Sequence, residues 1–230
     1  MHGRQFLIID ADDTLWENNI YFERALDEFI AFLDHSRLSA VEVRAVLDEI
    51  EAVNAKTHGY GSVNFGRNMQ QAYRRLAERE IDEDQLSAVM RIAEKILEQP
   101  LELIGGVRAT LEYLVSRHDL TLFTKGHAEE QKLKIDRSGL GVYFGHTAIV
   151  KEKDAASYRA LVATRGMDPA RTWMVGNSPR SDINPALEAG IGAVFVPHAN
   201  TWILERENIR QPEGTRLLRL NTFSDLQNHF

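Results

Sequence analysis

Three aspartates, Asp10, Asp12 and Asp13, follow directly on a run of four apolar residues at 6–9. A short apolar run that ends in a polar turn is typical of a strand buried on both faces of a sheet. In an open parallel sheet, ligands bind outside the carboxyl ends of the strands. A turn at this point can direct the carboxylates of Asp10 and Asp12 towards one substrate. The alternative is a strand followed by a solubilising acidic loop.

Three later stretches have the same character, with polar residues after apolar ones. They are residues 120–126, 150–154 and 173–183. Together with the first stretch, Asp10-x-Asp12-x-Thr14 after an apolar run, they resemble the four motifs of the haloacid dehalogenase (HAD) superfamily, in the right order. The resemblance covers about residues 1–200 of the chain. The order and spacing of the four motifs argue against the acidic-loop alternative.

The resemblance assigns roles to the first motif. Asp10 is the expected nucleophile, because a carboxylate can attack phosphorus and form an aspartyl-phosphate. Asp12 is the expected general acid for the leaving alcohol and then the base for the attacking water. The backbone carbonyl of Asp12 is also an expected metal ligand. Haloacid dehalogenases proper generally lack the second aspartate, so Asp12 favours the phosphotransferase branch of the superfamily.

The second motif ends in Thr124-Lys125-Gly126. The superfamily places Ser or Thr at the end of this strand, which Thr124 matches. Its hydroxyl and the backbone amides of Lys125 and Gly126 are expected to hold a substrate phosphate at a helix N-terminus. Taken alone, a threonine at a strand end is more often a simple helix cap.

The third motif of the superfamily is a lysine near the end of the next crossover. Lys153 matches it, because it opens a predicted helix, and Lys151 is the alternative. The ammonium group is expected to offset the negative charge of Asp10 and of the substrate phosphate. A solvated run of charges is the other interpretation of this stretch.

The fourth motif departs from the superfamily pattern, Gly-Asp-x3–4-Asp. Asn177 stands where the first acid is usual, and Asp182 matches the second. Magnesium prefers hard oxygen ligands, and an amide oxygen can serve although it adds no negative charge. The resemblance therefore implies a Mg²⁺ site made by Asp10, the carbonyl of Asp12, and Asn177 or Asp182, with waters.

The remaining pattern predicts the elements that position these motifs. Residues 17–101 show apolar residues at helical spacing and predict a four-helix insert, which matches the helical cap of the superfamily. Strands and helices then alternate from 102 onward, which indicates a parallel, doubly wound sheet. We therefore predict an α/β fold, a Rossmann-like HAD core of residues 1–16 and 102–230 with an inserted all-helical cap domain of 17–101. Residues in or near a cap turn are candidates for substrate contacts: His58, Tyr60, Asn64 and Arg67.

Composition excludes several classes of protein. The chain has 230 residues, is 43% hydrophobic and carries a net charge of −7 without a long basic run, so we expect no nucleic-acid or membrane partner. With no cysteine, the chain has neither disulfides nor thiolate chemistry. No apolar run approaches the ~20 residues of a membrane span. The first predicted strand begins too early to leave room for a signal peptide, so the expected location is cytoplasmic.

The predicted function is magnesium-dependent hydrolysis of a small phosphorylated metabolite through an aspartyl-phosphate. A phosphosugar mutase of the same superfamily would keep all four motifs and is one alternative. A non-catalytic binding or scaffold protein is the other, and Asn177 is the residue that favours it. Substrate identity and oligomeric state are not readable from the sequence, because specificity resides in contacts that one chain does not reveal.

Overall fold

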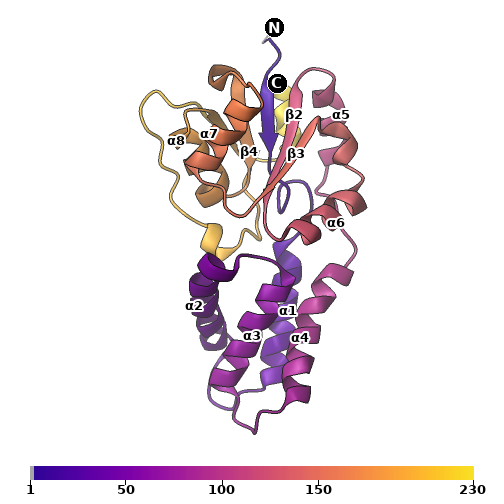
Figure 1. Ribbon diagram of the computed structural model, residues 1–230, viewed down its shortest axis with the longest axis vertical. Helices are drawn as coiled ribbons and strands as arrows, with labels where there is room; N and C mark the ends of the chain where they lie inside the picture. Colours follow the sequence, from indigo (N-terminus) through magenta and orange to yellow (C-terminus); the bar gives the residue numbers. More distant parts are fainter. Residues whose placement is uncertain (1–2) are drawn as a thin grey trace. The chain divides into compact units, whose positions relative to one another are not determined.

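The computed structural model describes residues 3–230, which form two compact units (Figure 1). One unit comprises the chain up to Asn19 together with Leu101–Phe230, and the other is Ile20–Pro100. The chain therefore leaves the first unit once and returns to it once.

The first unit contains a six-stranded parallel sheet in the order β3-β2-β1-β4-β5-β6. This order reverses direction at β1, as in a doubly wound sheet, and it confirms the predicted α/β fold class. The strands are β1 (Phe6–Ile9), β2 (Asp119–Lys125), β3 (His146–Val150), β4 (Thr172–Gly176), β5 (Gly192–Phe195) and β6 (Leu217–Arg219).

Helices cover both faces of this sheet (Figure 1). In β1, Leu7 and Ile9 pack in one core with α5, whereas Ile8 packs in the other core with α7. Burial on both faces explains why β1 is apolar throughout instead of alternating. The helices of this unit are α5 (Val107–Val115), α6 (Ala128–Ser138), α7 (Ala155–Thr164) and α8 (Asn184–Glu188).

The second unit is helical, and its residues include no strand. Its core is built from the apolar faces of all four helices, for example Phe29, Leu47, Met69 and Val89. Two helix starts have capping side chains: Ser39 and Glu42 form a capping box, and Asp82 caps the last helix. The helices are α1 (Asn19–Leu33), α2 (Ala40–His58), α3 (Ser62–Leu76) and α4 (Glu83–Glu98).

The candidate substrate contacts of the helical unit bind one another across the turn between α2 and α3. The Nδ2 atom of Asn64 donates to the carbonyls of His58 at 2.6 Å and Tyr60 at 3.5 Å. Arg67 donates to Oδ1 of Asn64 at 3.2 Å. These residues therefore hold the turn, and their contact with a substrate stays a prediction.

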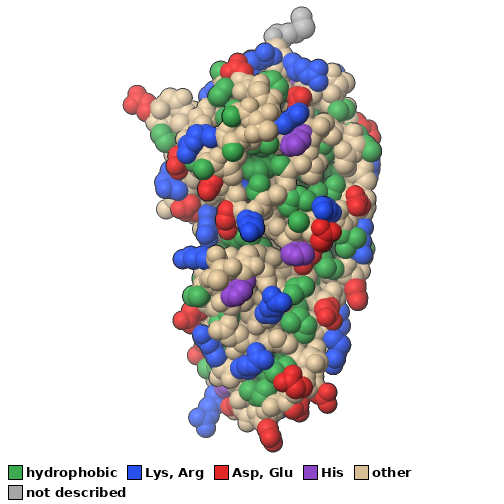
Figure 2. Space-filling model, in the orientation of Figure 1, with side chains coloured by type: hydrophobic (Ala, Val, Ile, Leu, Met, Phe, Trp, Pro, Cys, Tyr) green, Lys and Arg blue, Asp and Glu red, His purple; other side chains and the backbone are tan. Residues whose placement is uncertain are grey.

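Charged side chains of both signs are interspersed on the face shown in Figure 2. Within residues 3–230, none of the helices has the length and apolar character needed to cross a membrane.

Candidate active site

The loop after β1 is fixed to β4 and folds back on itself. The backbone N–H of Asp10 donates to the carbonyl of Val175 at 2.9 Å, and those of Thr14 and Leu15 donate to the carbonyl of Ala11. This turn brings the hydroxyl of Thr14 to 2.9 Å from Oδ2 of Asp10. The Asp10 side chain is thereby held at the carboxyl end of β1, where ligands of such sheets bind.

Lys153 joins two of the predicted acids. Its Nζ atom lies 2.5 Å from Oδ1 of Asp10 and 2.8 Å from Oδ1 of Asp182. Lys153, Asp10 and Asp182 come from three different strand ends and are 4%, 7% and 1% exposed, respectively. Lys151 is exposed, so Lys153 is the lysine that reaches Asp10.

This cluster carries more negative than positive charge. Burial opposes the charged form of Lys153, but the carboxylates of Asp10 and Asp182 raise its pKa above the ordinary value. Burial and the charge of Asp10 raise the pKa of Asp182 to about 7, against the attraction of Lys153. Two acids share one ammonium group, and a bound cation would relieve the repulsion between them.

Gly176 and the turn after it make room for Asp182. A Cβ atom at position 176 would lie 2.2 Å from Oδ2 of Asp182, so a larger residue would displace the carboxylate. The same oxygen accepts the backbone N–H of Ser178 at 2.9 Å. The segment Pro179–Ile183 is a π-helical turn, and such turns often occur at functional sites.

The oxygen atoms at this site suit a magnesium ion. The hydroxyl of Thr14 lies 3.3 Å from Oδ1 of Asn177 as well as 2.9 Å from Asp10, so the amide oxygen faces the nucleophile candidate. Both carboxylate oxygens of Asp182 already accept hydrogen bonds. The oxygen atoms of Asp10 and Asn177 therefore suit a hard divalent cation, and Asp182 could act on such an ion through Lys153 and Ser178. The carbonyl of Asp12 as a further ligand stays a prediction.

Asp12 lies in a separate environment two residues away. Its carboxylate oxygens lie 2.6 and 2.7 Å from Nζ of Lys134 and accept hydrogen bonds from Gln131 at 2.9 Å and Trp16 at 2.8 Å. Burial opposes ionisation, but Lys134 and these hydrogen bonds lower the pKa of Asp12. In this arrangement Asp12 is a carboxylate. Lys134 and Gln131 come from α6 and were not predicted.

Gly126 has a role other than the expected one. Its backbone N–H donates to the carbonyl of Val150 at 3.1 Å, so this amide is not one of the free phosphate donors that we expected. Its φ angle is +139°, and a Cβ atom would lie 2.9 Å from Nε2 of Gln131. Gly126 therefore lets Gln131 reach Asp12.

The other residues of the second motif lie at the end of β2. Thr124 is 1% exposed, and α6 begins after His127, so Thr124 is not the cap of that helix. Nζ of Lys125 lies 2.5 Å from Oε1 of Glu205 and 2.8 Å from Oγ of Ser181. Burial opposes ionisation of Glu205, but Lys125 lowers its pKa. The side chain of Lys125 thus forms an ion pair with an acid that was not predicted.

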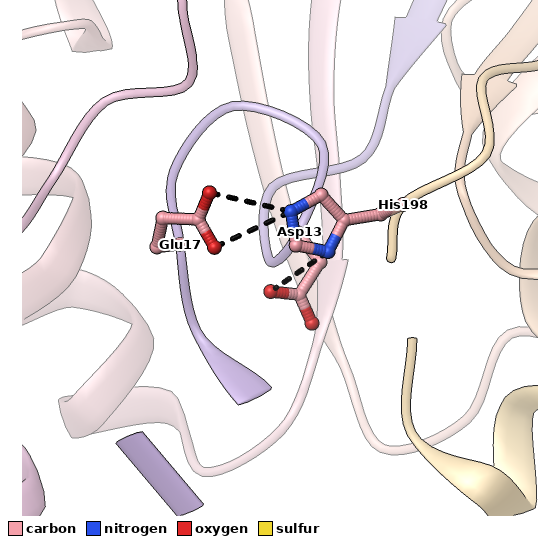
Figure 3. A group of neighbouring side chains, drawn as sticks. All are labelled: Asp13, Glu17 and His198. Carbon is pink, nitrogen blue, oxygen red and sulfur yellow. Dashed lines mark hydrogen bonds and ion pairs between the residues drawn. The ribbon is translucent and has the colours of Figure 1, made fainter. Parts of the chain in front are cut away.

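Figure 3 shows the imidazole of His198 between the carboxylates of Asp13 and Glu17. Nε2 lies 3.3 Å from Glu17 and Nδ1 lies 3.7 Å from Asp13. Nδ1 also accepts the backbone N–H of Asn200 at 3.3 Å, so both ring nitrogens have partners. Burial raises the pKa of Asp13 to about 7. This group joins the loop after β5 to the loop after β1.

The segment 197–206 is the part of the site that sequence reasoning missed. It contributes His198, Thr201 and Glu205, which contact the first, fourth and second motifs, respectively. The segment follows the apolar run 193–196, but its polar residues match none of the four motifs and it has no helical period, so no pattern singled it out.

This combination of a doubly wound sheet, a helical insert and buried acids at the strand ends defines a hydrolase of known type. The family model of haloacid dehalogenase-like hydrolases matches residues 6–190. The chain therefore belongs to this family and is a hydrolase, as the four motifs predicted.

Solved structures show how widely this architecture is shared. A haloacid dehalogenase-like family hydrolase from Xanthomonas campestris is 27% identical, with a TM-score of 0.84 over 100% of this chain and 95% of its own. The putative HAD hydrolase YfnB from Bacillus subtilis, bound to magnesium, is 15% identical, with a TM-score of 0.70 over 99% of both chains. A 2-haloacid dehalogenase from Pseudomonas syringae pv. Tomato is 22% identical, with a TM-score of 0.62 over 98% of this chain and 97% of its own. No curated protein matches the chain.

Proposed function

We propose that this hydrolase is a magnesium-dependent phosphatase that hydrolyses a small phosphomonoester through an aspartyl-phosphate. The observation that carries the proposal is the pair of aspartates in one turn, each paired with a different lysine. Asp10 pairs with Lys153 and Asp12 pairs with Lys134. A displacement at phosphorus needs both a nucleophile and a separate group that moves protons, and two carboxylates in different environments can divide these roles.

In the first step, an oxygen of Asp10 forms a bond to phosphorus as the bond to the leaving alkoxy oxygen breaks. The leaving oxygen takes a proton from Asp12 and departs as an alcohol. Lys153 stays protonated beside Asp10 and offsets the charge of the phosphoryl group. Thr124 is the proposed hydroxyl contact of that group at the end of β2.

In the second step, water attacks phosphorus and gives its proton to Asp12. The bond between Asp10 and phosphorus breaks, which frees the carboxylate and inorganic phosphate. Asp12 is protonated again at the end, so the two steps form a closed cycle. Because Lys134 holds Asp12 as a carboxylate in this structure, Asp12 must leave Lys134 before it can act as the acid.

Magnesium, when bound by Asp10, Asn177 and the carbonyl of Asp12, would neutralise charge on the phosphoryl oxygens. The excess of acids over Lys153 supports this part of the proposal, as does the orientation of the Asn177 oxygen towards Asp10.

The test is an assay of phosphate release from a panel of phosphorylated metabolites, with and without magnesium. We expect phosphate release that needs magnesium and is lost in Asp10→Asn. Release of halide from a 2-haloacid would instead indicate the activity named for the Pseudomonas relative. Isomerised phosphosugar without phosphate release would indicate a mutase, and no turnover of any substrate would indicate the non-catalytic alternative.

A further inference from the structure

Asn177 occupies the place of an acid at the proposed cation site, and an amide differs from a carboxylate in having two unlike ends. Only the Oδ1 atom can bind a cation, whereas the Nδ2 group repels one. The two ends look alike in shape, so the hydrogen bonds around them decide the orientation. The neighbours of Asn177 therefore determine whether it serves as a ligand at all.

Left to the first motif alone, the amide would turn the wrong way. The hydroxyl of Thr14 lies beside Oδ1 of Asn177 and is also bound to Oδ2 of Asp10. The hydroxyl proton of Thr14 is directed to Asp10 at 2.9 Å, and its contact with Asn177 is longer, at 3.3 Å. With its proton directed to Asp10, the Thr14 oxygen can only accept, so an NH₂ group turned to this side would gain a hydrogen bond that the amide oxygen cannot make.

Thr201, on the other side of Asn177, opposes that orientation. Its hydroxyl donates its proton to the carbonyl of His198 at 3.0 Å. The oxygen of Thr201 can then only accept, and it accepts Nδ2 of Asn177 at 3.0 Å. Thr201 and Asn177 are both 6% exposed, so water does not replace this bond freely.

We propose that Thr201 is a positioning residue for the cation site, which fixes the Asn177 amide with its oxygen towards Asp10. Partners of a metal ligand commonly orient it, and their loss costs about 10- to 100-fold in metal affinity. This inference rests on the proposed magnesium site. It explains how an asparagine can serve there: the hydroxyl of Thr201 selects the amide oxygen.

The inference predicts a difference between two backgrounds. In the native chain, Thr201→Val removes the acceptor and should weaken cation binding about 10-fold or more. In the Asn177→Asp background both ends of the side chain are oxygens, so the same Thr201→Val change should weaken binding far less. Thr201→Ser keeps the hydroxyl and should bind the cation within about threefold of the native protein.

The experiment is a titration of the substrate-free protein with Mn²⁺ followed by electron paramagnetic resonance, with Mg²⁺ as competitor. It compares the native protein, Thr201→Val, Thr201→Ser, Asn177→Asp and the Asn177→Asp/Thr201→Val double variant, each checked for folding by circular dichroism. If Thr201→Val does not fold, Thr201→Ala removes the same hydroxyl without adding a methyl group in its place.

Three outcomes are distinct. The proposal is supported if Thr201→Val binds the cation weakly, Thr201→Ser binds it nearly as the native protein does, and the Asn177→Asp background loses far less affinity on the Thr201→Val change. Equal dissociation constants for the native protein and Thr201→Val, or an equal loss in both backgrounds, would overturn it and leave the phosphatase proposal standing. Failure of the native protein to bind either cation would overturn the magnesium site and this inference together.

Discussion

Asp10 and Asp12 are the same residue type, two positions apart in one turn, yet their surroundings differ. Asp10 shares Lys153 with a second acid, Asp182, in a cluster that is almost fully buried. Asp12 has Lys134 to itself, and its side chain is 23% exposed. The first environment holds the Asp10 carboxylate in place, whereas the second leaves the Asp12 carboxylate partly exposed. The structure thus separates the proposed nucleophile from the proposed proton carrier.

The largest effect should come from the nucleophile. Asp10→Asn should lower turnover by several orders of magnitude on every phosphoester, because an amide cannot form the acyl phosphate. Asp12→Asn should damage turnover of sugar phosphates more than that of an activated aryl phosphate, whose leaving group needs little acid help. Steady-state kinetics with both substrate classes measures this. Equal losses on both classes for the two variants would remove the distinction between the two aspartates.

Lys153→Met should destabilise the fold strongly. It leaves Asp10 and Asp182 buried beside each other without the ammonium group, and breaking a buried ion pair costs about 3–5 kcal/mol. Lys153 has a raised pKa, so its contribution is fully present at pH 7 and is lost only above its ordinary pKa. Urea unfolding at pH 7 checks the prediction against Lys151→Met, which changes an exposed lysine and should leave stability unaltered.

The metal dependence should separate the two residues of the fourth motif. Asp182→Ala should raise the magnesium concentration for half-maximal activity about 10- to 100-fold, since it removes an indirect partner of the site. Asn177→Asp should lower that concentration by a smaller factor, because it adds ligand charge. Magnesium titrations of activity in one buffer test both. Identical half-saturating magnesium concentrations for the native protein, Asp182→Ala and Asn177→Asp would show that the fourth motif is not part of the metal site.

Lys134→Met should have a smaller effect that depends on pH. The pKa of Asp12 is lowered in the folded protein, so its pairing stabilises the fold above the ordinary pKa of an aspartate and is lost as pH falls through the folded value. We expect Lys134→Met to lower the unfolding free energy by about 1–3 kcal/mol at pH 7. This is less than the cost of breaking a fully buried pair, because both side chains are partly exposed.

At pH 3.5 the cost of Lys134→Met should be clearly smaller, since Asp12 then approaches neutrality in the unfolded chain. Lys132→Met is the matched control on the same helix, because Lys132 is exposed and pairs with Glu129 three residues earlier on the same helix. A cost that is the same at both pH values would show that Lys134 acts through packing and not through the charge of Asp12.

Sequence patterns predicted the fold because each element carried its own signal. The apolar run at 6–9 and the capping residues Ser39 and Asp82 are local features that the structure reproduces. The resemblance to the superfamily pointed to Lys153 with Lys151 as the alternative, and the structure places Lys153 beside Asp10.

The partners of the site residues could not be found in this way. Lys134 lies within α6, where a lysine ordinarily faces solvent, and only the folded chain brings it to Asp12. Thr201 and Glu205 lie 24 and 80 residues from their partners Asn177 and Lys125 in a segment without periodicity. The amide of Gly126 was expected to be free because the strand pairing that uses it was not yet known. Contacts of this kind depend on tertiary structure and leave no local pattern.

Trapping the intermediate shows whether Asp10 carries the phosphoryl group. Asp12→Asn should still react with an aryl phosphate but should activate water poorly, so the phosphorylated protein should accumulate. Acid-quenched protein is digested and analysed by mass spectrometry. We expect a phosphoryl group on the peptide that contains Asp10, removable by hydroxylamine and absent when Asp10 is also changed to Asn. Turnover of the substrate by the native enzyme, without any phosphoryl group on that peptide in the variant, would contradict it.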